Sequence, residues 1–484
     1  MADGNSSHTA PIHILDDDSI LNIFYFYRPV ILGYDDDGFR IVGGQAGWER
    51  ERWWYDPAQV CQRWRNLLLG SASYLDLCLA CTNGTPVADM LAHSPPLPLV
   101  IDSNSLYWPN VAENEEGIIL ALEKRDRVRR VRLARPVPDL QKLIMAIDEE
   151  YPVLEYLIVE SPTVGASPLM LPEALQAPHL HHLSLKGVVP PTGSRLFTTA
   201  VGLVTLSLVV GHPSTYFQPN VLLHWLSLMP QLETLLISFS FPVPNRDVER
   251  QLLRTPTTTH VTLSNLRWFE FQGVSAYMEA ILRRITAPRL ERLGIFLFKQ
   301  LTFSIPRFVQ FMNTAENLRF NSAKFKFYRD GVGVYVYLRE QAKTYPLQMG
   351  VYCLHLDWQV SFAAQIFNSL TQVSSAVEHL TLKHKAHSRS SEEHNEVDRA
   401  EWRKLLTSFS NAKTLRVGDG LIKEISRSLR LEDGEHSLEL LPELQELTYS
   451  GSDDEFKSFI DARQAVGCPV TLVRPSPKSV TPLS

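Results

Sequence analysis

The sequence predicts an α/β solenoid that follows a small α-helical module. Its 484 residues are too many for one compact core, which rarely extends beyond about 250–300 residues. The chain must therefore fold as several domains or as a stack of repeats. Beyond residue 100, apolar residues recur with the spacing of buried strands, and stripes with helical spacing lie between them. This alternation of strand and helix favours the stack of repeats.

The composition is that of a folded protein and narrows the possible functions. The 47 lysines and arginines nearly balance the 53 aspartates and glutamates, so the formal charge of -6 argues against general attraction to nucleic acid or an anionic membrane. Five unevenly spaced cysteines argue against a secreted disulfide protein, and we expect a cytoplasmic or nuclear location, or both. The sequence has no apolar run of bilayer length and no basic, apolar start, so we expect neither a membrane helix nor a signal peptide.

Two amphipathic helices are predicted near the start, after a leader of residues 1–10 that we expect to be disordered. The first follows the capping residues 16–19, carries an apolar stripe and ends at a proline; its stripe is Ile20, Ile23, Phe24 and Tyr27. The second begins at Asp56 and Pro57 and ends at Gly70; its stripe is Val60, Trp64, Leu67 and Leu68. Residues 28–55 form a long, partly mobile insertion between the helices.

These helices resemble an F-box over about residues 11–80. Residues 15–24 (LDDDSILNIF) resemble its opening and residues 60–67 (VCQRWRNL) its second half, although Asp16 stands where the family usually has proline. The resemblance implies that the module binds a Skp-family adaptor and joins the chain to a cullin-RING ubiquitin ligase. The implied adaptor-binding residues are Ile20, Ile23, Phe24, Val60, Trp64, Leu67 and Leu68. The alternative is an ordinary helical hairpin in which the two stripes pack only on each other.

Apolar triplets at i, i+3 and i+5 mark the predicted strands. They begin at Val128, Leu154, Leu180, Leu203, Leu232, Leu266 and Leu290, at intervals of 23 to 34 residues, and continue with Val351/Leu354/Leu356, Val377, Ala412 and Leu444. An irregular unit is expected near residues 318–327. Intervals of this length are typical of a solenoid whose parallel sheet lines one face and whose helices cover the other.

The units resemble the leucine-rich repeats that follow F-boxes in fungal proteins, which implies an irregular horseshoe with a concave parallel sheet. The family's asparagine or cysteine after the third apolar position is missing, so we expect irregular curvature. Residues 81–97 are expected to be a linker or capping segment, residues 98–473 the solenoid, residues 386–397 a mobile loop and residues 474–484 a disordered tail.

Strand alternation predicts which side chains the concave face presents, because successive residues point to opposite faces. The candidate target-binding residues are Arg130, Arg132, Tyr156, His182, Trp268, Glu270, Arg292, Phe296, His355, Lys383 and Arg416. A mixture of aromatic and charged residues suits a protein partner better than a phosphate backbone, which needs a continuous basic track. The alternative is that most of these side chains are only solvated.

No motif nominates a catalytic, metal or cofactor site. The basic run 124–135 keeps the apolar spacing of a strand, which argues against a nucleic-acid patch. Cys78 and Cys81 lack the second pair of ligands that a zinc site needs, and the two glycines of residues 331–333 are too short a motif to indicate a nucleotide site. We therefore expect a non-catalytic substrate-recognition subunit of an SCF-type ubiquitin ligase, without cofactor, that binds an unknown protein. The alternative is a repeat scaffold outside any ligase, whose first helices only cap the solenoid.

Overall fold

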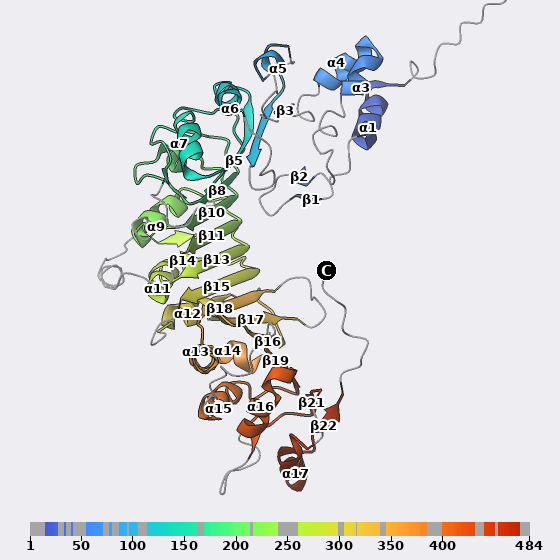
Figure 1. Cartoon of the computed structure of the whole chain (residues 1–484), viewed down its shortest axis with the longest axis vertical. Coiled ribbons are helices and arrows are strands. Elements are labelled where there is room, and N and C mark those ends of the chain that lie inside the picture. The colour runs from blue at the N-terminus through green and yellow to red at the C-terminus, as the bar shows by residue number, and fades with distance from the viewer. Residues whose placement is uncertain are drawn as a thin grey trace, which may run out of the picture. The chain divides into compact units, whose positions relative to one another are not determined.

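The computed structural model forms two compact units, Met1–Leu203 and Val204–Ser484 (Figure 1). It describes residues 15–27, 33–34, 40–41, 55–70, 77–79, 87–93, 96–104, 114–161, 169–212, 216–240, 260–298, 304–315, 317–338, 345–384, 399–430, 440–450 and 454–474. The leader of residues 1–10, the loop 386–397 and most of the tail lie outside these residues, as does most of the insertion 28–55. No described helix has the length and apolarity to cross a membrane.

The first unit opens with the helical module of α1 (Asp17–Tyr27), α3 (Tyr55–Val60) and α4 (Gln62–Gly70). Asp16 caps α1, since its Oδ1 accepts a hydrogen bond of 2.7 Å from the Ser19 backbone N–H. That bond lowers the pKa of Asp16. Within the insertion, β1 (Gly33–Tyr34) pairs antiparallel with β2 (Arg40–Ile41).

A parallel sheet follows in the same unit, with its strands in chain order. It contains β3 (Leu77–Leu79), β4 (Leu99–Asn104), β5 (Val128–Ala134), β6 (Tyr156–Glu160) and β8 (His182–Lys186). The connecting helices are α5 (Val87–His93), α6 (Glu115–Leu122) and α7 (Val137–Met145), and α8 (Arg195–Thr199) follows the short pair of β7 (Leu169–Met170) and β9 (Val188–Val189). The sheet therefore starts before residue 98, because β3, α5 and β4 already form a strand–helix–strand unit.

The second unit begins with the same pattern. Its first strands, β10 (Thr205–Val210), β11 (Thr234–Phe239), β13 (Trp268–Gly273) and β15 (Arg292–Phe298), pair parallel in chain order. The helices between and after them are α9 (Pro219–Ser227), α11 (Ser275–Leu282) and α12 (Pro306–Thr314), and β12 (Val261–Thr262) pairs with β14 (Ile285–Thr286) beside them. Neighbouring helices hold one another: the Glu279 carboxylate of α11 accepts hydrogen bonds from the first N–H groups of α12, those of Arg307 and Phe308.

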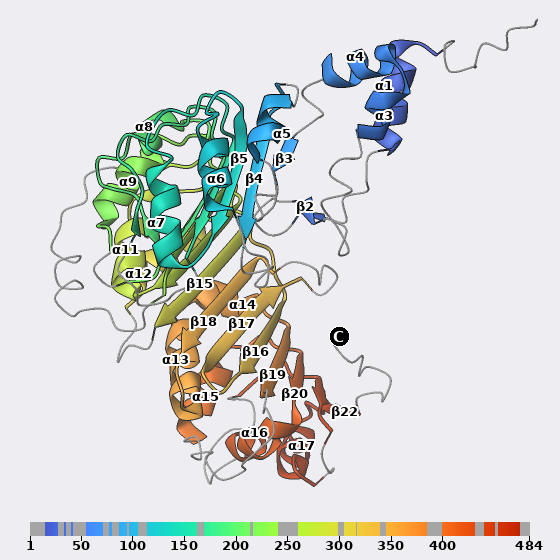
Figure 2. The same cartoon turned by 45° about the horizontal axis from the view of Figure 1, so that its top comes forward.

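A three-stranded meander then interrupts the repeat (Figure 2). Strands β16 (Ser322–Phe327), β17 (Gly331–Tyr337) and β18 (Leu347–Tyr352) are joined antiparallel, and β18 pairs parallel with β15. The repeat resumes where β16 pairs parallel with β19 (His379–His384). The prediction of an entirely parallel sheet is wrong at β17, because the tight turn at residues 328–330, closed by the Tyr328 N–H to Gly331 carbonyl bond of 2.7 Å, reverses the chain.

The last repeats complete the second unit. After β18 come α13 (Leu356–Ser369) and α14 (Thr371–Ser375), and α15 (Arg399–Thr407) follows β19. Strands β20 (Thr414–Val417), β21 (Glu446–Thr448) and β22 (Thr471–Val473) extend the sheet in parallel, with η4 (Asp419–Leu421), α16 (Ile422–Leu429) and α17 (Lys457–Ala465) between them.

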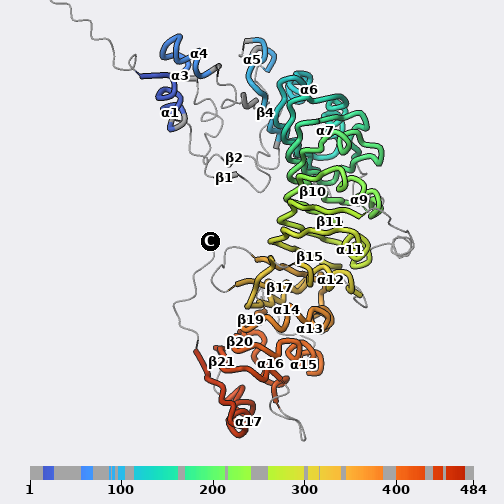
Figure 3. The backbone as a smooth tube through the Cα atoms, turned by 180° about the vertical axis from the view of Figure 1, so that it is seen from behind, coloured from blue at the N-terminus to red at the C-terminus, as the bar shows by residue number. Residues whose placement is uncertain are grey.

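Within each unit the helices that alternate with the strands lie on one face of the sheet (Figures 1 and 3). We call the other face the open face. The predicted triplets point toward the helices and form the core; Leu232, Leu235 and Ile237, for example, are all buried. The predicted α/β solenoid of parallel strands and covering helices is therefore confirmed within each unit, apart from β17, while the horseshoe curvature stays a prediction.

One predicted strand is wrong. Of Val351, Leu354 and Leu356, only Val351 lies in a strand, at the end of β18, whereas Leu354 is 71% exposed and Leu356 begins α13. His355 is consequently the N-terminal cap residue of α13, where its ring contacts the Trp358 ring at 5.5 Å between centroids. It does not lie on the sheet face that its predicted strand position implied.

Candidate functional site

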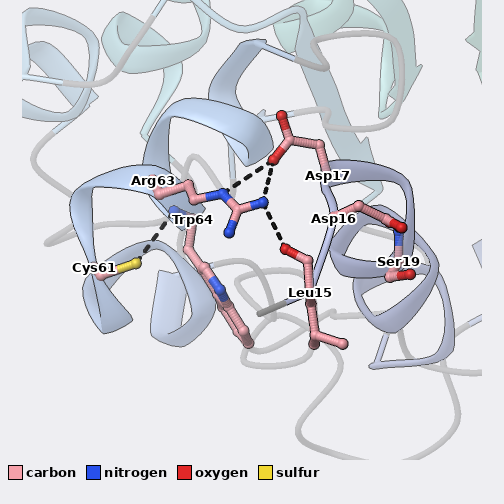
Figure 4. Close-up of polar contacts among 7 residues, drawn as sticks. All are labelled: Leu15, Asp16, Asp17, Ser19, Cys61, Arg63 and Trp64. Atoms are coloured by element: carbon pink, nitrogen blue, oxygen red, sulfur yellow. Dashed lines mark hydrogen bonds and ion pairs between the residues drawn. The ribbon is translucent and has the colours of Figure 1, made fainter. Parts of the chain in front are cut away.

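Polar contacts of Arg63 fix the helical module across the insertion (Figure 4). The guanidinium Nη2 lies 2.6 Å from Asp17 Oδ1 at the start of α1 and donates to the Leu15 carbonyl at 2.7 Å. The Arg63 and Asp17 side chains are 39% and 58% exposed, so their attraction adds little to stability. The contacts join α4 to the start of α1, on the other side of the insertion.

The seven predicted adaptor-binding residues differ in their exposure. Ile20, Phe24, Trp64 and Leu68 are buried, and the rings of Phe24 and Trp64 meet edge to face at 5.0 Å. These four residues hold the helices of the module together. The outward apolar residues are Ile23, 39% exposed, and Val60, 54% exposed, with Leu67 between the two extremes.

The open face of the first unit brings three of the predicted target-binding residues together. Register places Arg130, Tyr156 and His182 side by side on β5, β6 and β8. The Arg130 guanidinium lies 4.4 Å above the Tyr156 ring, which stacks on the His182 ring at 5.6 Å. This stacking row is ordered by contacts between strands, as expected for a surface that binds without rearranging.

Arg132 does not belong to the exposed surface. It is only 5% exposed; of the two residues paired with it across the strands, Ile158 on β6 is buried and Asp102 on β4 is exposed. Its predicted place on the open face follows correctly from strand alternation, but alternation gives the direction of a side chain and not whether other residues cover it. Arg132 is therefore removed from the candidate contact residues.

The open face of the second unit carries an aromatic cluster, defined as Trp268, Glu270, Arg292 and Phe296. The Arg292 guanidinium lies 4.3 Å above the Trp268 ring on the neighbouring strand. Burial raises the pKa of Glu270, and the Arg292 charge opposes that rise. All four predicted residues therefore lie on adjacent strands, where an arginine and two aromatic rings give the anchors common at protein interfaces.

Two glycines shape this cluster, and sequence reasoning missed both. A Cβ atom at Gly350 would lie 2.8 Å from Phe296 Cδ1, and one at Gly294 would lie 3.0 Å from Glu270 Cγ. Each of the two side chains thus lies across the backbone of the next strand, in space that only a glycine leaves open. The sequence signal for this arrangement is a glycine at an open-face position of each of two adjacent strands, β15 and β18.

The other two predicted residues, Lys383 and Arg416, belong to a second group that we call the lysine cluster, with Lys324 and Lys326. Lys326 and Lys383 are paired across β16 and β19, and Lys324 lies in the same row as Arg416, with Thr381 between them. Burial lowers the pKa of Lys324 to about 8, with smaller contributions from the charges of Lys326, Lys383 and Arg416. Lys383 has a lowered pKa for the same reasons.

Sequence reasoning missed Lys324 and Lys326 because they lie in the irregular unit, for which no triplet was assigned. The signal was present: Lys324 and Lys326 alternate with the buried Phe325 and Phe327, which is the period of a strand with one open face. The ammonium group of Lys326 also lies 4.7 Å above the ring of Tyr335, an open-face residue of β17.

The described residues contain no group of three or more His, Cys, Asp or Glu that could hold a metal ion. Cys61, Cys353 and Cys468 belong to no disulfide, and Cys61 Sγ accepts a 3.4 Å hydrogen bond from the Trp64 backbone N–H. Cys78 lies in β3, whereas Cys81 lies outside the described residues.

Comparison with known proteins gives similarity among solved structures alone. No protein-family model matches the chain, and no curated protein matches it. Among solved structures, the chain is similar to the leucine-rich repeat-containing protein LegL7 from Legionella pneumophila, over 59% of this chain and 88% of that chain. The sequence identity is 14% and the TM-score 0.21. At that TM-score the two chains do not superpose as wholes, so the assignment as an α/β solenoid rests on the strand pairing and helix placement described above.

Proposed function

We propose that this chain is a non-catalytic receptor that binds a protein on the open face of its solenoid. The observation that carries the proposal is the aromatic cluster, where Arg292 stacks on Trp268 and Phe296 lies across Gly350, all on the face that the helices leave uncovered. Stacked arginine and aromatic side chains are the residues that most often dominate the affinity of protein interfaces. Neighbouring strands fix their positions, so little conformational entropy is lost on binding.

The helical module would bind a Skp-family adaptor and thereby join the receptor to a cullin-RING ubiquitin ligase. The resemblance of residues 60–67 to an F-box supports this role, as does the exposure of Ile23 and Val60, which leaves apolar surface for a partner. Ubiquitin transfer would then belong to other subunits, and this chain would raise the effective concentration of the target's lysines. Such a role fits a cytoplasmic or nuclear protein.

A scaffold outside any ligase is the second candidate. The buried contacts of Phe24 and Trp64 support it, because they show that the module's stripes pack on each other as in an ordinary helical hairpin. In that case the module would act only as a cap for the solenoid.

The two candidates differ in one measurable property. Purified full-length chain and a purified Skp-family adaptor are mixed and passed over a size-exclusion column. Co-elution in a stoichiometric complex is the expected result for the receptor. Separate elution at concentrations of about 10 μM, where specific complexes of standard size are formed, would leave only the scaffold.

A further inference from the structure

The lysine cluster brings together positive charges that are far apart in the sequence. Lys326 and Lys383 are directly paired, so their Cα atoms lie about 4.8 Å apart, and Lys324 and Arg416 are two strands apart, at about 10 Å. The two rows are separated by two residues along the strands, or about 6.6 Å. The four cations therefore occupy a compact area on the open face, whereas binding along a nucleic-acid backbone takes a longer basic track.

These four charges have no anionic partner among the described residues. The ion pairs of the described residues join other lysines and arginines, such as Lys413 to Glu378 and Arg427 to Glu424. Around Lys324, the facing groups are Lys326 on its own strand, Tyr335 on β17, His379 and Lys383 on β19, and Arg416 on β20. A chain with a formal charge of -6 thus gathers four cations at one place, and no acidic side chain of the described residues pairs with them.

We propose that the lysine cluster binds an acidic segment of the partner protein, held in an extended conformation with a negative charge at every second residue. In an extended segment, side chains at i and i+2 point to the same side and lie about 6.6 Å apart. This spacing matches the distance between the row of Lys324 and Arg416 and the row of Lys326 and Lys383. The inference rests on the proposed protein-binding function and specifies the chemistry of the partner.

The titration of Lys324 gives the site a pH dependence. With a pKa of about 8, Lys324 is largely charged at pH 7 and largely neutral at pH 9. A bound carboxylate or phosphoryl group favours the charged form, so binding takes up a proton and weakens as the pH rises through this range. Carboxylates stay ionised throughout, so the change belongs to the protein.

The test is a fluorescence-polarisation titration of the full-length chain with labelled peptides of equal length. One peptide carries three glutamates at alternate positions, a second carries them consecutively, a third has glutamines, and a fourth has phosphoserine in place of the alternate glutamates. We expect either alternate acidic peptide to bind, about tenfold more tightly than the consecutive one, and the glutamine peptide not to bind. Lys326→Gln with Lys383→Gln should lower the affinity about tenfold, whereas Lys423→Gln with Lys457→Gln, which removes the same two charges from exposed positions on α16 and α17, should leave it unchanged.

The pH arm separates a binding role from a structural one. Wild-type affinity for the alternate peptide should fall between pH 7 and pH 9, and Lys324→Arg should make that fall smaller because arginine stays charged. The inference is overturned if neither acidic peptide binds, if the Lys326 and Lys383 variant binds as tightly as wild type, or if a DNA duplex binds more tightly than both peptides. Adaptor co-elution measured on the same samples distinguishes the failures: lost peptide binding with the adaptor retained refutes this inference alone.

Discussion

Truncation of Ile23 and Val60 to alanine should weaken adaptor binding about 30-fold. Full burial of an aliphatic side chain contributes about 1.5–3 kcal/mol, so the exposed 39% of Ile23 and 54% of Val60 offer roughly 1 kcal/mol each to a partner that covers them. Their sum of about 2 kcal/mol corresponds to a change of about 30-fold in Kd. Isothermal titration calorimetry of the full-length chain with purified adaptor measures this difference.

A matched control is available on the same helical module. Asn22 on α1 and Asn66 on α4 are exposed and polar, so the double variant Asn22→Ala and Asn66→Ala should bind the adaptor like wild type. Both double variants should keep α1, α3 and α4 folded, as judged by hydrogen exchange. If wild type binds and the Ile23 and Val60 variant binds with the same Kd, the adaptor contacts another surface and the assignment of these residues is refuted.

Three further predictions concern the interior and the electrostatics. Phe24→Ala should destabilise the helical module by about 3–5 kcal/mol, because it removes a buried ring against Trp64; unprotected amides in α1 and α4 would show this in hydrogen exchange, and unchanged protection would contradict it. The pKa of Lys324 is lower in the folded chain than in the unfolded chain, so the unfolded chain binds more protons above pH 8 and the contribution of this group to stability increases between about pH 8 and 10.5. The free energy of unfolding in urea, measured for wild type and for Lys324→Met, should give a difference that rises over this pH range. A difference that does not change with pH would refute the prediction. Gly350→Ala should lower the free energy of unfolding by about 1–3 kcal/mol in wild type, because the added methyl group overpacks against Phe296, and by much less in the Phe296→Ala variant. Equal losses of stability in the two backgrounds would exclude the contact.

The core of the repeats could be read from the sequence because it depends on local periodicity. Leu232, Leu235 and Ile237 are buried as their spacing predicts, and the open-face residues Trp268 and Glu270 follow from the same alternation. The first helix of the helical module was predictable from its cap and stripe, whereas the single helix predicted from Asp56 to Gly70 is divided at Cys61 into α3 and α4.

The errors arise where local periodicity does not identify the element. Leu354 and Leu356 continue the spacing of Val351, but the strand ends at Tyr352 and a helix begins at Leu356. Three apolar residues at i, i+3 and i+5 fit the end of a strand followed by the start of a helix as well as one longer strand. The meander was missed although Asp330 and Gly331 are followed by alternating valines, which is the sequence signal for a hairpin.

The sequence by itself determined the alternation of strands and helices, the residues that form the core and the residues that face away from it. Only the tertiary structure decided which strands are neighbours, and hence that Lys326 lies beside Lys383 and that Phe296 lies across Gly350. It also decided that Arg132 is covered and that Phe24 packs inside the module while Ile23 remains exposed. The physical reason is that the direction of a side chain follows from the local backbone, whereas its neighbours and its exposure depend on segments brought together from distant parts of the chain.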